Sequence, residues 1–276
     1  MLLVLFLVCV WWCNIPGDAE VVNSFEETCP QFFFKGVPPG VGLQPNRPAW
    51  ICQRYKNQYR YATLYDKDHR IPVYSAYIYN PGQAKRPKNW MVEPQLVDEL
   101  LPPEMSSESA IVKKFRSTQA ELMKSQAVSQ DYKNLVDYNR GHMNPNSHQP
   151  DLDAKKSTFT LTNIVPQYIK LNGGTWNQYE QYTMSSNTQG CKETFAIVGA
   201  VPGNNYIANR RVNIPSYVWS AACCFIDNNH LRSWAVIASN DENVAEDLTL
   251  GELEEVLGVL YHGRSVSLFH SDCPRE

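Results

Sequence analysis

The chain has 276 residues, with 25 Lys and Arg against 28 Asp and Glu, so its formal net charge at pH 7 is −3. Hydrophobic residues make up 43% and charged residues 19%, an ordinary globular composition that excludes a collagen-like, coiled-coil or wholly disordered chain. Because the charge is near neutral, the protein is not a general polycation. Any nucleic-acid partner would have to be met by a local basic face.

The first residues are typical of a secretory signal rather than of a folded segment. The run Leu2–Trp12 is apolar throughout, but it is shorter than the roughly 20 residues that a membrane-spanning helix needs. Small residues at Gly17 and Ala19 suit cleavage after Ala19, although no basic residue precedes the run. The alternative is a buried N-terminal helix. We expect a signal peptide at residues 1–19, a secreted protein without a membrane span, and one domain over residues 20–276.

An even number of cysteines remains after this cleavage, which predicts disulfides in a secreted chain. They are Cys29, Cys52, Cys191, Cys223, Cys224 and Cys273. The first two are close in sequence and separate from the rest, which favours that pair. The adjacent Cys223 and Cys224 would point to opposite faces of a strand, so they would bond to different partners, or one would stay free. Because no CxxC pair occurs, a zinc site is not expected.

The first half of the domain is expected to begin with a loop and to continue into a strand pair. Pro30–Pro48 is rich in Pro and Gly and predicts an ordered loop. Tyr59–Tyr65 and Ile71–Tyr79 carry dense Tyr, Val and Ile, which favours strands, with Asp66-Lys67-Asp68 as their turn. Ser106–Lys133 is polar and predicts a solvated helix and loop, with a basic patch that faces nucleic acid as the alternative.

The second half predicts three more strands and a helix. Thr194–Pro202 is a strand-sized apolar run, and Ile214–Phe225 and Leu231–Ser239 flank a turn at residues 227–229. Val244–Gly258 has apolar residues at helical spacing, with Gly258 as its C-cap. Strands of antiparallel type with few helices between them predict the α+β class.

The segment Asn139–Pro145 has a composition suited to catalysis. His is the side chain whose ordinary pKa suits general-base work near neutral pH, and here it is His142. Gly141 allows a sharp backbone turn, and Arg140 is able to pair with a phosphate or a carboxylate. A lone His in a loop is more often structural than catalytic, so this segment alone indicates little.

A second segment strengthens the case. Thr160–Gln167 is strand-like, and a helix is expected to open near Thr175. Asn172, Trp176 and Glu180 are spaced i, i+4, i+8 and would line one helical face. An amide oxygen and a carboxylate on that face suit Mg²⁺ with several retained waters, and a nearby His base would complete a site for phosphodiester hydrolysis. The alternative makes Asn172 a helix cap and Glu180 a solvated charge.

Together, the Arg-Gly-His sequence, the segment Thr162–Gln167 and the later Asn, Trp and Glu resemble the DNA/RNA non-specific endonucleases of the ββα-metal type. The resemblance covers nearly all of the chain after residue 19. It implies an α+β fold with a central antiparallel sheet flanked by helices and long loops. It also implies cleavage of DNA and RNA with little sequence preference, with Mg²⁺, or Mn²⁺ as its substitute, as the cofactor.

The resemblance also implies a role for each matching residue. His142 corresponds to the general base that activates water, and Asn172 corresponds to the direct protein ligand of a single Mg²⁺. Glu180 corresponds to the acid that hydrogen-bonds the metal-bound waters. Asn163 corresponds to an Asn that supports the site, and Arg140 corresponds to the Arg beside the base, which orients the phosphate. We therefore count His142, Arg140, Glu180 and Asn163 as catalytic candidates and Asn172 as the metal ligand.

Two further positions do not match the family pattern residue for residue. The family has an upstream Arg that stabilises charge in the transition state, and Arg86 or Lys88 is expected to fill this substrate-binding role. The family also has an Asp before Arg-Gly-His, where this chain has Asn139. An acid there is expected to hold Arg140 by charge-assisted hydrogen bonds. The neutral Asn therefore predicts reduced activity, and Asn139→Asp is expected to keep or increase it.

Two functions from different classes follow from these observations. The first is a secreted, Mg²⁺-dependent endonuclease that acts on DNA and RNA through phosphate contacts. The second is a nuclease-like extracellular module that binds nucleic acid or another partner with weak or no catalysis. The candidate base, ligand and acid favour the enzyme, whereas Asn139 and the mild acidity favour the module.

Overall fold

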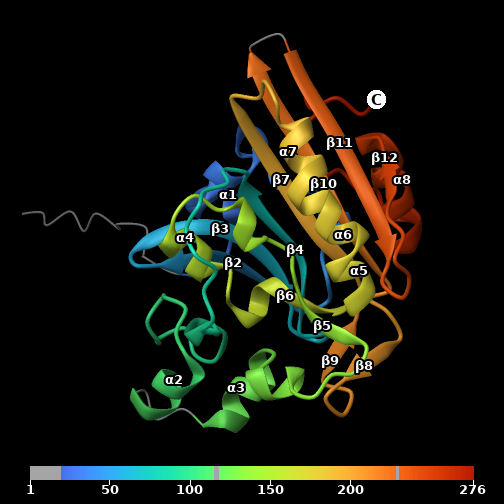
Figure 1. Cartoon of the computed structure of the whole chain (residues 1–276). Helices are drawn as coiled ribbons and strands as arrows, with labels where there is room; N and C mark the ends of the chain where they lie inside the picture. Colours follow the sequence, from blue (N-terminus) through green and yellow to red (C-terminus); the bar gives the residue numbers. More distant parts are fainter. Residues whose placement is uncertain (1–19, 115–117, 228–229) are drawn as a thin grey trace, which may run out of the picture.

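The computed structural model describes residues 20–114, 118–227 and 230–276, and the expected signal peptide at residues 1–19 lies outside them. Within these ranges an eight-stranded sheet forms the centre of the molecule (Figure 1), and all of its neighbouring strands are antiparallel. In spatial order its strands are β1 (Val21–Val22), β2 (Pro48–Tyr55), β3 (Gln58–Asp66), β4 (Ile71–Ile78), β7 (Glu193–Val201), β10 (Tyr217–Asp227), β11 (His230–Ser239) and β12 (Glu246–Leu248). The α+β class is confirmed.

The predicted strands are present, and three further strands, β1, β2 and β12, extend the sheet. The runs expected at Tyr59–Tyr65 and Ile71–Tyr79 are β3 and β4, and the three later runs are β7, β10 and β11. Strand β2 was not predicted, although it pairs with β3 along its whole length. The fully buried Gln53 interrupts its apolar pattern. The Pro-rich loop before it contains only short 3₁₀ turns, at Pro30–Phe32, Phe34–Gly36 and Val41–Leu43.

The sheet has a separate hydrophobic core on each face, because side chains alternate along a strand. In β7, Ala196, Val198 and Ala200 face one core, whereas Phe195 and Ile197 face the other. The second core is completed by the aromatic N-terminal segment, α1 (Phe25–Thr28) and α8 (Leu250–Leu260). The sheet is therefore the middle layer of three.

The first core is covered by a helical run that lies along β7 and β10 (Figure 1). The run consists of α5 (Ile169–Gly173), α6 (Thr175–Gln178), a π-helical turn (Tyr179–Thr183) and α7 (Met184–Asn187). Trp176 is buried under it, and the Tyr179 hydroxyl donates to Ser220 Oγ of β10 at 2.9 Å. These contacts fix the run against the sheet.

The predicted bounds of the helix Val244–Gly258 were wrong at both ends. Residues 246–248 form β12, which pairs with β11, and the helix α8 begins only at Leu250. Thr249 caps it, with Glu252 in a reciprocal capping box. The helix continues through Gly258 to Leu260, so Gly258 is not its C-cap. Local capping chemistry therefore sets the start of this helix, rather than the first apolar residue of the pattern.

The remaining elements lie around one end of the sheet (Figure 1). They are α2 (Glu108–Lys114), α3 (Gln119–Ser125), α4 (Leu152–Ser157), the strand pair β5 (Tyr138–His142) and β6 (Ile164–Tyr168), and the strand pair β8 (Asn205–Ile207) and β9 (Val212–Ile214). Helices α2 and α3 occupy the expected polar segment and bury Ile111 and Leu122. In the part of the chain that the structure describes, no helix is long and apolar enough to cross a membrane.

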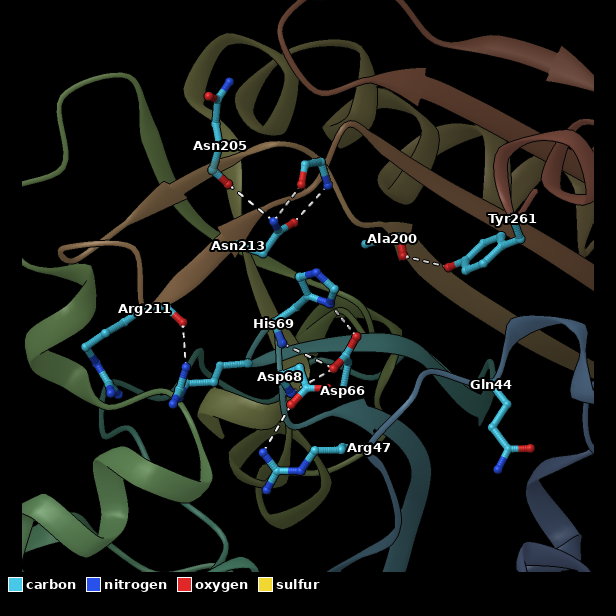
Figure 2. A network of polar contacts seen from close by, with 12 residues as sticks. Gln44, Arg47, Asp66, Asp68, His69, Ala200, Asn205, Arg211, Asn213 and Tyr261 are labelled. Atoms are coloured by element: carbon cyan, nitrogen blue, oxygen red, sulfur yellow. Dashed lines mark hydrogen bonds and ion pairs between the residues drawn. The ribbon is translucent and has the colours of Figure 1, made fainter.

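Polar contacts order the turn between β3 and β4 (Figure 2). One carboxylate oxygen of the buried Asp66 accepts from the backbone N–H groups of Asp68 and His69, at 2.8 and 3.1 Å. The other lies 2.6 Å from His69 Nδ1, and this hydrogen bond raises the pKa of His69. Nearby, Arg47 pairs with Asp68. The predicted turn is thus confirmed.

Three disulfides tie the layers together. Cys29 bonds to Cys52, as expected, and the remaining pairs are Cys191–Cys224 and Cys223–Cys273. The neighbouring residues 223 and 224 belong to opposite cores. Strand β10 is therefore linked on one face to the segment after α7 and on the other face to the C-terminal segment.

Reduction of these disulfides is expected to destabilise the protein. The bonds join residues 23, 33 and 50 positions apart, and a disulfide closing a loop of this size contributes about 2–4 kcal/mol to the free energy of unfolding. Thermal unfolding with and without a reductant measures this effect, and mass spectrometry of alkylated protein tests the pairing. Six alkylated thiols in the unreduced, folded protein would contradict it.

Candidate active site

A polar cavity of about 510 Å³ lies where the β5–β6 pair meets the helical run. Its wall includes five of the residues predicted from the sequence, which come from three separate segments: Arg86, Arg140, His142, Asn172 and Glu180. Strand β6 leads directly into α5, so the two strands and the following helix form a ββα unit. This unit brings residues that are 38 positions apart in the chain, such as His142 and Glu180, to one cavity.

The Arg-Gly-His sequence lies in strand β5, not in the expected loop. Within the strand pair, Gly141 is opposite Val165 and His142 is opposite Ile164. A Cβ atom at Gly141 would lie 2.1 Å from Oε1 of the buried Gln167. The glycine is therefore required by this close approach rather than by a sharp turn. Its small size allows Arg140 and His142 to be held on a rigid strand.

His142 has the properties of a neutral base. It is 7% exposed, and its ring lies against Phe159 and Trp90, with centroids 5.0 and 5.5 Å away. Burial, helped by the nearby charges of Arg86 and Arg140, lowers the pKa of His142 to about 3. Nε2 has no hydrogen-bond partner among the described residues. The imidazole is therefore uncharged at neutral pH and has a nitrogen able to take a proton.

Arg140 is held between aromatic rings. Its Cζ lies 5.0 Å from the Trp90 ring centroid and 5.5 Å from that of Tyr132. Nη2 donates to the Ser129 carbonyl at 3.4 Å, whereas Nε is buried without a partner in the described structure. Burial lowers the pKa of Arg140, but a guanidinium stays charged in proteins. The cavity wall thus carries a fixed positive charge beside the base.

Of the two upstream candidates, Arg86 lies at the cavity and Lys88 does not. Arg86 is exposed, and its Cζ lies 5.4 Å from the Phe159 ring. Its charge acts on the pKa of both His142 and Glu180, so it is near both. Lys88 is exposed and is absent from the cavity wall formed by the described residues. The structure therefore favours Arg86 for the substrate-binding role.

Asn172 is oriented by Asn139, at a position where an acid was expected to hold Arg140. The Asn172 Nδ2 donates to Asn139 Oδ1 at 2.6 Å, and both side chains line the cavity. Because its amide nitrogen is engaged, Asn172 presents Oδ1 to a ligand. The observed contact of position 139 is thus with the candidate metal ligand, and a neutral Asn is able to make it.

This contact changes the expectation for variants at position 139. An Asp would also accept from Asn172 Nδ2, so Asn139→Asp is expected to keep the half-saturating Mg²⁺ concentration within about threefold or lower it. Asn139→Ala removes the acceptor and is expected to raise that concentration about 10–100-fold, the usual cost of losing a partner of a metal ligand. Metal titrations of both purified variants measure this. Equal titrations for wild type and Asn139→Ala would show that Asn172 is oriented by something else.

Glu180 lies on the π-helical turn and is partly buried. Burial raises its pKa to about 8, although the nearby Trp176 indole and the charge of Arg86 act in the opposite direction. Trp176 itself is buried in the core, so of the three residues expected on one helical face only Asn172 and Glu180 line the cavity. The Gly174 break between α5 and α6 separates these two residues.

The raised pKa makes cation binding depend on pH. Without metal, Glu180 is protonated below about pH 8, whereas a bound cation favours the carboxylate. Mg²⁺ affinity is therefore expected to rise from pH 6 to pH 8, by at most about tenfold per pH unit, and then to level off. Calorimetric titrations across this range measure the effect, and Glu180→Gln should bind more weakly with a flatter profile. Identical pH profiles for the two proteins would exclude Glu180 as the titrating group.

Asn163 is not part of the cavity wall as the described residues define it, and it holds the neighbouring backbone in place by hydrogen bonds. Its Nδ2 donates to the carbonyls of Asn144 and Thr158, and its Oδ1 accepts from Ser75 Oγ and from the Asn144 N–H, all at 2.9–3.0 Å. It is fully buried, and its donors and acceptors are engaged. Asn163 is therefore a positioning residue that joins β4 to the segment after His142, and it is not a catalytic one.

The donor set of the cavity fits a cation that keeps most of its water. In the described ranges, no group of three or more His, Cys, Asp and Glu side chains is placed to hold a metal ion. Asn172 and Glu180 instead provide an amide oxygen and a carboxylate. Mg²⁺ is usually held by one or two such protein oxygens and several waters. The residues therefore fit Mg²⁺, or Mn²⁺ as its substitute, and not a metal that requires a full protein cage.

Trp90 was not assigned a role from the sequence, yet it lines the cavity. Its ring contacts both the Arg140 guanidinium and the His142 imidazole. The available signal was an aromatic residue two positions after the basic segment Lys85–Lys88. Trp90 and Phe159 together exclude water from one side of His142, which is the burial that keeps this imidazole neutral.

Comparison with known proteins places the chain in a family. The family model for DNA/RNA non-specific endonuclease matches residues 39–265. The Endonuclease domain-containing 1 protein of Homo sapiens is 31% identical over 265 residues, 94% of this chain and 50% of that protein. Its Mus musculus counterpart is 33% identical over 242 residues, 83% of this chain and 45% of that protein. The chain thus spans about half the length of these relatives.

Two more distant matches cover less of the chain or are less similar. Nuclease EXOG, mitochondrial, of Mus musculus is 30% identical over 110 residues, 40% of this chain and 28% of that protein. A crystal structure of the EndoG/EndoGI complex matches with a TM-score of 0.47 and 16% identity, over 72% of this chain and 81% of that chain. From the family match over most of its length, we conclude that this chain belongs to the DNA/RNA non-specific endonuclease family.

Proposed function

We propose that the protein is a secreted, Mg²⁺-dependent endonuclease that hydrolyses phosphodiester bonds of DNA and RNA with little sequence preference. The observation that carries this proposal is a buried, neutral His142 in the same cavity as Asn172, Glu180 and the guanidinium of Arg140. Family membership supports nucleic acid as the substrate. Three disulfides, which are typical of oxidising compartments, support secretion.

In this proposal His142 takes a proton from the water whose oxygen attacks phosphorus. The phosphorus–oxygen bond to the leaving sugar oxygen breaks, and that oxygen takes a proton from solvent. Arg140 and Arg86 bind the phosphate oxygens, on which negative charge builds up in the transition state. Asn172 and Glu180 would hold Mg²⁺, which when bound supplies positive charge to the phosphate and the leaving oxygen. Contacts to phosphate rather than to base edges account for the low sequence preference.

The alternative function, a nuclease-like binding module, has less support from the site. Its main sequence argument was Asn139, which here makes the contact that orients Asn172. The net charge of −3 predicts that the surface outside the cavity binds nucleic acid only weakly. The two functions differ in whether bound nucleic acid is cleaved.

The deciding experiment is digestion of supercoiled plasmid and of a long RNA by the purified protein. We expect nicking and then degradation with Mg²⁺ or Mn²⁺, and no cleavage with EDTA. The ionic strength is kept fixed, because phosphate contacts make binding salt-dependent. Intact nucleic acid with either metal, together with a shift of the same nucleic acid in a binding gel, would support the module and refute the enzyme.

A further inference from the structure

A buried histidine outside the cavity contacts the backbone of the turn that carries Glu180. His148 ends the 3₁₀ turn Asn146–His148 and is 2% exposed. Its Nε2 lies 2.8 Å from the carbonyl oxygen of Glu180, and its Nδ1 lies 2.9 Å from the hydroxyl oxygen of Tyr77. Tyr77 belongs to β4 and is also buried. A chain of two hydrogen bonds thus runs from the central sheet to Glu180.

The partners fix the protonation state of this histidine. A carbonyl oxygen only accepts, so Nε2 must carry the proton and donate it to Glu180. In the neutral ring Nδ1 then accepts from the Tyr77 hydroxyl. Burial lowers the pKa of His148 to about 4, so the ring stays neutral at physiological pH. The Tyr79 ring packs edge-on at 4.7 Å and further restricts the orientation of the imidazole.

The contact is made at an unusual place in the helical run. Residues Tyr179–Thr183 form a π-helical turn, in which the Tyr179 carbonyl accepts from the N–H of Met184, five residues later. Such turns are rare and often occur at functional sites. Next to His148, Ser147 Oγ accepts from Gln181 Nε2 at 2.9 Å. Two successive residues of one short segment therefore hold two successive residues of this turn.

We propose that His148, oriented by Tyr77, is a positioning residue that fixes the π-helical turn so that the Glu180 carboxylate faces the cation site. The inference rests on the proposed function, because it assigns the role through Glu180. His148 does not touch substrate or reacting atoms. Its loss would leave the turn free to move and would weaken cation binding without removing either Asn172 or Glu180.

The test measures cation binding directly, without cleavage. Mn²⁺ is titrated into the purified full-length protein, and free Mn²⁺ is followed by electron paramagnetic resonance. His148→Ala is expected to raise the half-saturating Mn²⁺ concentration about 10–100-fold, the usual effect of removing a group that orients a metal-binding residue. His148→Gln keeps a side-chain N–H donor and should recover part of this loss. Tyr77→Phe removes only a hydroxyl and is expected to raise the concentration by severalfold.

Tyr179→Phe is the matched control. It removes a buried hydroxyl from the same helical turn, but that hydroxyl donates to Ser220 and not to Glu180. Because this hydroxyl helps to hold the run against the sheet, the control is expected to lower Tm as much as Tyr77→Phe does while weakening Mn²⁺ binding less than Tyr77→Phe does. If His148→Ala does not fold, the comparison of Tyr77→Phe with Tyr179→Phe tests the inference instead.

Wild-type Mn²⁺ affinity in Tyr77→Phe and in every folded His148 variant would overturn the inference. Equal weakening in Tyr77→Phe and Tyr179→Phe would overturn it as well, because the effect would then be general loosening of the run. By contrast, if the wild-type protein itself neither binds Mn²⁺ nor cleaves nucleic acid, it is the proposed function that fails. The wild-type titration therefore separates the two failures.

Discussion

Replacing His142 by Ala is expected to lower kcat by about 10²–10⁴-fold, the usual cost of losing a general base. In the proposed mechanism the base is the neutral ring, and the low pKa of His142 keeps that form dominant at neutral and mildly acidic pH. The loss should therefore persist at the acidic end of the pH range, where a histidine of ordinary pKa would be protonated and could not act as a base. Initial rates of plasmid cleavage at saturating Mg²⁺ measure it.

The matched control for this variant is His230→Ala. His230 is an exposed histidine in β11 and is not part of the cavity wall that the described residues form. It should cleave at the wild-type rate with an unchanged Tm. A His142→Ala protein that is folded and cleaves as fast as wild type would remove His142 from the reaction. The base would then have to be sought elsewhere in the cavity.

Asn172→Ala is expected to raise the half-saturating Mg²⁺ concentration by more than Asn139→Ala does, and so by more than about 10-fold. Asn139 acts only through the orientation of Asn172, whereas Asn172 would supply the oxygen that contacts the cation. At saturating Mg²⁺ the rate should recover in large part, because His142 and Arg140 remain in place. A titration of cleavage rate against Mg²⁺ separates the two effects.

Asn177→Ala provides the comparison for this second variant. Asn177 belongs to the same helical run and lines the same cavity, but nothing in the sequence pattern assigns it to the cation. A loss of Mg²⁺ affinity in Asn177→Ala but not in Asn172→Ala would move the ligand from α5 to α6. Unchanged half-saturation in both variants would leave Glu180 as the main protein group at the cation.

The sequence allowed the candidate site to be predicted because its residues lie in two short segments with informative spacing. His142 and Arg140 occur next to a glycine, and Asn172 and Glu180 follow within one helical run. Strand β6 joins these segments, so the predicted strand-like run was already the physical link between them. The fold class could be predicted for a similar reason. Its strands are long and apolar enough to be recognised in the sequence without knowing which strands they pair with.

What could not be predicted depends on contacts between segments far apart in the chain. The hydrogen bond between Asn139 and Asn172 joins residues 33 positions apart, and the hydrogen bond that Tyr77 donates to His148 joins residues 71 positions apart. Local sequence gives no sign of either bond. The buried Asn163 has an amide that suits catalysis or support equally well, and only its four occupied hydrogen bonds distinguish the two roles.

The adjacent cysteines of β10 have a consequence for proteolysis. Because Cys223 and Cys224 attach opposite layers to one strand, a peptide bond cut in the segment 192–222 or 225–272 still leaves both fragments joined covalently through the strand. Nicked protein should therefore migrate as a single band on a non-reducing gel and separate only after reduction. A protease could then cut exposed connections in these two segments without releasing the strands against which the helical run of the site packs.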